Sequence, residues 1–287
     1  MKNKITIFTK PWVLPAEKLA ELTADLGADG VELAVRKGYA VNPDNISTEL
    51  PRAAEIFRRA GLVIGSIAGD TDEKIIAACG ESGIPIIRIC VGINMSEGYL
   101  ASEKKIRSGF DKLLPALEKH HVAIGVQNHY GFMIGSAVGL LHLIEQYNSR
   151  QICAVLDPAH CAIAGEPETM ALDIIWNQLG MVNFKSASRM RINGPDEEEA
   201  KWKVLWTTAQ HSGYSWRSML GALARRSYPG VFCLPAEYSH PEGNGQLMGD
   251  AVIPLLKKDI TYLKKLMKEN PAPEKKQNTE WQSTGDK

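Results

Sequence analysis

Short apolar runs rich in β-branched residues alternate with longer amphipathic segments along most of the chain. Between the runs, apolar residues recur three or four positions apart, as Leu19, Leu22 and Leu26 do, and this spacing predicts helices. The expected strands cover residues 5–9, 30–33, 62–67, 85–91, 122–127, 152–157, 181–185 and 231–237. Strands that alternate with helices predict a parallel sheet.

The number of expected strands favours a closed α/β barrel over an open sheet. Eight parallel strands is the number that closes a (β/α)8 TIM barrel, and about 250 residues suffice for one. The rival is an open doubly wound sheet, but no GxGxxG follows the first run and no phosphate-binding GKS or GKT occurs. We expect one TIM-barrel domain over residues 1–267 and a polar, disordered tail over 268–287.

Composition and charge exclude several classes of partner. The formal net charge is zero, which gives no electrostatic basis for binding nucleic acid or a membrane surface. The five cysteines are scattered without a CxxC pair, as expected for reduced, buried thiols. The first apolar stretch is too short for a secretory signal, and no run reaches the ~18 apolar residues of a membrane span. We expect a cytoplasmic protein.

Polar residues stand where several of the expected strands end. They are Gln127, Asp157, Asn183 with Lys185, and Glu237. Parallel strands of a barrel bring their carboxyl ends to one face, where barrel enzymes keep their active sites. The pattern therefore predicts an enzyme.

Each of these residues also has a purely structural interpretation. Asp157 precedes Pro158 and suits the N-cap of a helix. Glu237 is followed by Tyr238 and a glycine-rich loop rather than by a helix, so the case for Glu237 as a helix N-cap is weaker than for Asp157. Arg88 lies inside an apolar strand and requires a carboxylate partner, so it serves either a buried ion pair or a substrate.

Three long connections follow expected strands, at residues 34–47, 128–136 and 186–215. Long loops in compact domains are usually functional or disordered. In the third, Arg189 and Arg191 are either phosphate ligands or part of a solvated charged loop.

A carboxylate, a lysine and a histidine around a barrel mouth suit proton abstraction next to a carbonyl. That reaction needs a base and a cation that stabilises the enediolate charge. The cation can be an ammonium such as Lys185 or a divalent metal.

Over residues 5–265 the chain resembles the sugar phosphate isomerase/epimerase superfamily, the xylose-isomerase-like barrels that include tagatose/psicose 3-epimerases and inosose dehydratases. The resemblance rests on DGVEL, VQNHYG, LDPAH, FKS, GYSW and AEY. It implies a metal held at Gln127, Asp157, Asn183 and Glu237. Glutamine here replaces a glutamate and asparagine replaces a histidine. A divalent Mg²⁺, Mn²⁺ or Zn²⁺ would therefore be weakly held or absent, with the hard cations favoured.

The resemblance and the residues together define the expected site. Glu237 is the expected base, with Lys185 and His160 stabilising or protonating substrate oxygens. The expected substrate contacts are Glu32, Asn128, His129, Trp12 and Arg88. With one glutamate lost, a one-base isomerase or a dehydratase fits better than a two-base epimerase.

Two other classes remain as alternatives. A catalytically weakened barrel that binds carbohydrate or regulates a partner would explain the two amides. The DNA-repair endonucleases of the superfamily match poorly, because they carry a richer His/Glu cluster and should have a basic face. We expect a small carbohydrate as partner, and a homo-oligomer is left open.

Overall fold

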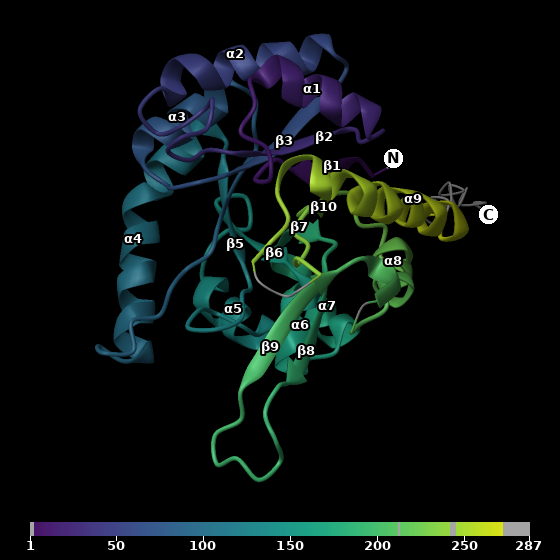
Figure 1. Cartoon of the computed structure of the whole chain (residues 1–287). Helices are drawn as coiled ribbons and strands as arrows, with labels where there is room; N and C mark the ends of the chain where they lie inside the picture. Colours follow the sequence, from purple (N-terminus) through teal and green to yellow (C-terminus); the bar gives the residue numbers. More distant parts are fainter. Residues whose placement is uncertain (1–2, 212, 242–244, 272–287) are drawn as a thin grey trace, which may run out of the picture.

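The computed structural model describes residues 3–211, 213–241 and 245–271. Within this part, eight parallel strands form a closed barrel in the order β1-β10-β7-β6-β5-β4-β3-β2, which confirms the predicted TIM barrel (Figure 1). The barrel strands are β1 Ile5–Phe8, β2 Gly30–Ala34, β3 Val63–Ala68, β4 Ile86–Ile89, β5 Ala123–Gln127, β6 Ile152–Leu156, β7 Leu179–Asn183 and β10 Phe232–Leu234. Each lies within one of the predicted runs or within two residues of it.

Helices follow the strands and form the outer layer of the barrel. They are α1 Ala16–Asp25, α2 Ile46–Arg59, α3 Glu73–Glu81, α4 Tyr99–His120, α5 Ala137–Ile144, α6 Pro158–Ala164, α7 Glu168–Ile175, α8 Trp216–Arg225 and α9 Ile253–Glu269. Short 3-10 turns lie at η1 Trp176–Gln178, η2 Ala209–His211 and η3 Gly249–Val252. The predicted tail from residue 268 overlaps the end of α9, and its residues 272–287 lie outside the described part.

Strand side chains alternate between two apolar layers. Residues such as Val182 and Phe184 point outward and pack with the helices, while Met181 and Cys233 point inward. The inward layer takes one side chain from each of six strands: Phe8, Ala34, Ala68, Val155, Met181 and Cys233. Cys233 pairs in register with Asn183 and Ala68 pairs with Arg88, so this inward layer lies at the level of the polar residues at the strand ends.

The connection after β7 contains an element that the sequence reading did not predict. Strands β8 Ser186–Arg191 and β9 Trp202–Thr207 form an antiparallel hairpin, which extends away from the barrel in Figure 1. Of the residues named in this connection, Arg189 lies over the Trp202 ring at 4.3 Å. Arg191 bonds Asn193 and the Glu197 carbonyl within the hairpin loop. Among the described residues, no helix is long and apolar enough to cross a membrane.

Candidate active site at the barrel mouth

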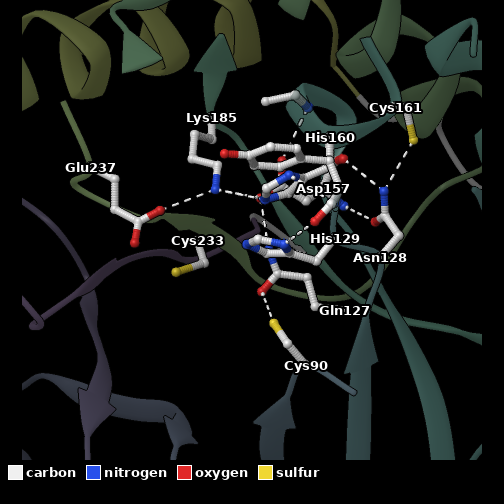
Figure 2. A network of polar contacts seen from close by, with 12 residues as sticks. Cys90, Gln127, Asn128, His129, Asp157, His160, Cys161, Lys185, Cys233 and Glu237 are labelled. Carbon is white, nitrogen blue, oxygen red and sulfur yellow. Dashed lines mark hydrogen bonds and ion pairs between the residues drawn. The ribbon is translucent and has the colours of Figure 1, made fainter. Parts of the chain in front are cut away.

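The predicted strand-end residues meet in one polar network (Figure 2). Lys185, two residues after the end of β7, places its Nζ 3.0 Å from Glu237 Oε2 and 3.2 Å from Asp157 Oδ2. The same Nζ lies 2.9 Å from Nε2 of His160. Figure 2 shows the ammonium between Glu237 on one side and Asp157 with His160 on the other. Lys185 is therefore the hub of the site.

Asp157 both begins a helix and anchors the network. Its Oδ1 accepts from the backbone N–H of Ala159, so it caps α6 as the Asp-Pro pair suggested. Its Oδ2 accepts from Gln127 Nε2 at 2.8 Å as well as from Lys185. Burial raises the pKa of Asp157 and the Lys185 ammonium opposes this shift. Because its oxygens face N–H donors, Asp157 is a carboxylate here.

Glu237 is the most accessible carboxylate of the network. Its side chain is 15% exposed, whereas that of Asp157 is fully buried. Ala236, just before it, has a φ of 56°, a left-handed conformation that is uncommon for a residue with a Cβ. Burial opposes the charge on Glu237, but the ammonium groups of Lys185 and Lys10 prevail and lower its pKa to about 2.

Two residues that the sequence analysis did not predict as site residues complete the network. Lys10, just after β1, lies 2.6 Å from Glu237 Oε1, and its side chain is 27% exposed. Trp206 of β9 faces Lys185, whose Nζ lies 4.2 Å from the ring centroid, and contacts the His160 ring edge-on. Lys10 directly follows the expected strand 5–9, the same strand-end position that marked the other residues of the network. The only signal for Trp206 was its place in the long connection 186–215 after an expected strand.

The rings of His129 and His160 lie against each other, tilted, beside the Lys185 ammonium. The His129 and His160 ring centroids are 4.0 Å apart. Burial and the positive charge of Lys185 lower the pKa of His160 well below its usual range. The Lys185 ammonium donates to its Nε2 at 2.9 Å, while the Tyr130 backbone N–H faces its Nδ1 at the longer distance of 3.4 Å. His160 therefore accepts a hydrogen bond from Lys185 and stays neutral.

Most of the expected substrate contacts have partners inside the protein. Arg88 makes a two-point ion pair with Glu32, at 2.8 and 2.7 Å, and donates to Gln127 Oε1 at 2.6 Å. The buried Asn128 side chain bonds the backbone N–H and C=O of Asp157. Trp12 is 3% exposed and belongs to the apolar core. Of the five, His129 is half-buried, and its Nδ1 lies 2.8 Å from the Tyr130 carbonyl oxygen.

The expected metal ligands do not fit a metal in this arrangement. Gln127 uses its oxygen on Arg88 and its amide nitrogen on Asp157, and the two carboxylates face lysine ammonium groups. Asn183 is 1% exposed and has no hydrogen-bond partner for either amide atom. Its oxygen is thus the one uncommitted ligand of the predicted four. Within residues 3–211, 213–241 and 245–271, no three His, Cys, Asp or Glu side chains are grouped as a metal site.

Comparisons with known proteins establish the family. The family model described as xylose isomerase-like TIM barrel matches residues 20–266, and the chain belongs to this family. No protein with a curated function matches the sequence.

Solved structures share the fold at low identity. A 3-keto-D-glucoside 4-epimerase from E. coli has a TM-score of 0.69 at 12% identity, covering 92% of this chain and 100% of the other. A D-allulose 3-epimerase from Methylomonas sp. has a TM-score of 0.69 at 13% identity, covering 92% and 98%. A probable 3-DHS dehydratase from Bacillus anthracis has a TM-score of 0.66 at 12% identity, covering 91% and 98%.

Proposed function

We propose that this protein is a sugar or sugar-phosphate isomerase or epimerase that moves a proton at the carbon next to the substrate carbonyl. One observation carries the proposal: a partly exposed carboxylate, Glu237, lies 3.0 Å from the buried ammonium of Lys185. This pair offers a base and an electrophile within reach of one small molecule. The family membership, with sugar epimerases among the structural neighbours, supports the same reaction class.

Glu237 is the base. It is ionised at neutral pH because two ammonium groups hold its pKa at about 2. A carboxylate this acidic is a weak base in the free protein. As negative charge develops on the substrate oxygen, it offsets the Lys185 ammonium and raises the proton affinity of Glu237 during the transfer.

Lys185 stabilises the charge that forms. Burial disfavours its ammonium, but Asp157 and Glu237 prevail and raise its pKa, so the group stays protonated. When Glu237 removes the proton, the C–H electrons form the enediolate and the charge moves to the former carbonyl oxygen. As Glu237 takes up the proton and loses its charge, the Lys185 N–H that faced it turns to that oxygen and stabilises it. The hydroxyl proton on the carbon that lost its C–H then passes to this oxygen, and Glu237 gives a proton to the former carbonyl carbon.

The contacts of Gln127 favour a single base. Its amide is bonded to Arg88 and Asp157 and has no basic atom, so a second base on the opposite face of the carbon is missing at this position. Transfer between neighbouring carbons by one base therefore fits better than two-base epimerisation. Loss of a β-hydroxyl from the same enediolate, a dehydratase reaction, is the second candidate, and it shares the first step. A probable 3-DHS dehydratase among the structural neighbours supports the dehydratase reaction as this second candidate.

Solvent-deuterium exchange tests the proposal. The full chain is incubated in D₂O with a panel of keto- and aldo-sugars, free and phosphorylated, and NMR detects deuterium at the carbon next to the carbonyl. Glu237→Gln should slow exchange by ~10²–10⁴-fold, the usual contribution of a positioned base. Glu21→Gln, on an exposed surface ion pair, is the matched control and should exchange normally.

Two outcomes would contradict the assignment. Exchange that survives Glu237→Gln would remove Glu237 as the base. If no sugar exchanges and Glu237→Gln changes ligand affinity alone, the protein is a carbohydrate-binding or regulatory barrel.

A further inference from the structure

The Lys185 ammonium occupies a position that a metal ion would need. Its three N–H groups face three acceptors, on Asp157, Glu237 and His160, at 2.9–3.2 Å. The face of Trp206 lies against it at 4.2 Å, and the lysine side chain is only 5% exposed. A cation at this point already has a nearly complete set of contacts.

We propose that the Lys185 ammonium is the resident cation of this site and that the site binds no divalent metal. The part of this inference that concerns catalysis rests on the function proposed above. The part that concerns metal binding stands on the contacts alone.

The carboxylate oxygens are committed to N–H donors. Asp157 Oδ1 accepts from Ala159, and Oδ2 accepts from Gln127 and Lys185. Glu237 Oε1 accepts from Lys10, and Oε2 accepts from Lys185. A metal ion would have to displace ammonium groups from both side chains. The charge is also balanced, because two ammonium groups already face these two carboxylates.

The amide of Gln127 is fixed in an orientation that opposes metal binding. Its oxygen accepts from Arg88 and its NH₂ group donates to Asp157. Turning the amide over would place NH₂ against a guanidinium and oxygen against a carboxylate. Both contacts would be repulsive, so Gln127 directs N–H groups rather than oxygen at Asp157.

Asn183 alone cannot make up the difference. Its buried amide has a free oxygen, but one neutral oxygen does not hold a divalent ion, which takes several oxygen or nitrogen ligands. The ammonium thus supplies by itself the positive charge that a metal would bring. Because it is part of a side chain, this cation cannot dissociate into solvent.

Removing the ammonium should uncover a metal site. In Lys185→Met, the acceptors on Asp157, Glu237 and His160 lose their shared donor, and Asn183, two residues before Lys185 in the chain, has an uncommitted amide oxygen. Two carboxylates, an imidazole and an amide form a reasonable set for Mn²⁺. Lys185→Gln is a second variant that keeps hydrogen-bonding capacity, in case the first does not fold. Lys18→Met, on an exposed helix surface, is the control.

The experiment measures metal binding directly. The full chain and each variant are treated with chelator, then titrated with Mn²⁺, Mg²⁺ and Zn²⁺ while melting temperature and heat of binding are recorded. Metal content is measured before and after. We expect no bound metal and no rise in melting temperature for wild type and Lys18→Met, and a rise with Mn²⁺ for Lys185→Met or Lys185→Gln.

Stoichiometric metal in the wild type, released by chelator with a fall in melting temperature, would overturn the proposal. So would the absence of any Mn²⁺ response in both folded Lys185 variants, because the ammonium would then not be what fills the place of the ion. Neither result depends on turnover. The deuterium-exchange test can fail while the metal titration gives the expected result, and the metal titration can fail while deuterium exchange is observed. The two proposals can therefore be rejected separately.

Discussion

At the scale of single residues, Asp157 shows how one side chain combines a structural and a chemical role. It caps α6 through one oxygen and contacts Lys185 and Gln127 through the other. Capping fixes the position of the carboxylate, because the first turn of the helix holds it in place. The two interpretations that the sequence offered for Asp157 are therefore not exclusive.

Asp259 is another buried carboxylate, and it bonds the residue that follows Glu237. It lies on α9, is 4% exposed, and accepts from the Tyr238 hydroxyl at 2.8 Å and the Ala209 N–H at 2.9 Å. Tyr238 follows Glu237 directly, so this carboxylate ties the end of the last barrel strand to α9. Burial raises the pKa of Asp259 from 3.8 to about 6.

This shift predicts a definite pH dependence of stability. Because the pKa is higher in the folded than in the unfolded chain, the folded state binds more protons between these two values. The Asp259 contribution to the free energy of unfolding should therefore grow as the pH falls through 6, by on the order of 2 to 3 kcal/mol. Asp259→Asn, which cannot ionise, should lose this part of the pH dependence.

Urea unfolding between pH 4 and pH 8 checks this prediction. Asp25→Asn, an exposed carboxyl on α1, serves as control and should keep the wild-type dependence. Parallel curves for the wild type and Asp259→Asn would contradict the expected protonation.

At the scale of elements, the β8–β9 hairpin joins the barrel mouth through its base. The Trp206 N–H donates to the Ser239 hydroxyl, and the Ser239 N–H donates to the Trp206 carbonyl, both at 2.9 Å. These bonds attach β9 to the segment just after Glu237. The hairpin therefore brings Trp206 to the site, while Trp202 at its far end is 49% exposed.

The two tryptophans of β9 make a matched pair for mutation. Trp206→Ala removes the aromatic face from Lys185 and His160 and should lower kcat/KM at least ~10-fold, since a desolvated cation–π contact contributes about 2 kcal/mol. Trp202→Ala, which loses the stacking of Arg189, should leave activity unchanged. Steady-state kinetics on a sugar found by deuterium exchange measures both. Equal effects would mean that the hairpin acts as a whole rather than through Trp206.

At the scale of the whole molecule, closure of the barrel depends on close approaches between neighbouring strands. Gly30 of β2 faces β3, where an added Cβ would lie 2.0 Å from the Val63 carbonyl oxygen. That distance is far below a van der Waals contact, so a side chain there forces the two strands apart. Gly109 on the exposed side of α4 has no atom within 4 Å of such a Cβ.

These two glycines predict opposite effects of the same substitution. Gly30→Ala should destabilise the fold by ~3 kcal/mol, because the backbone of β3 cannot move without disturbing the barrel. Gly109→Ala should stabilise it by about 0.5–1 kcal/mol through the lower entropy of the unfolded helix segment. Thermal and urea unfolding provide the measurement. A neutral Gly30→Ala would show that β2 and β3 are less tightly packed than described.

The barrel strands and part of the candidate site could be predicted from the sequence. The apolar runs gave the barrel strands because burial on both sides requires continuous apolar segments. The end of each run gave Gln127, Asp157, Lys185 and Glu237, since parallel strands must bring their ends to one face. The pairing of Arg88 with a carboxylate was likewise expected, because a buried charge needs a partner.

The sequence by itself thus determined the barrel and which polar groups would meet at its mouth, because both depend on where continuous apolar runs lie along the chain and which polar residues end them. Only the tertiary structure decided how those groups pair. It showed that Arg88 takes the oxygen of Gln127, that Lys185 lies among the acceptors, and that Lys10 and Trp206 join them from distant elements. Such pairings depend on distances of a few ångströms between strands far apart in the chain, and no periodicity along the sequence encodes them.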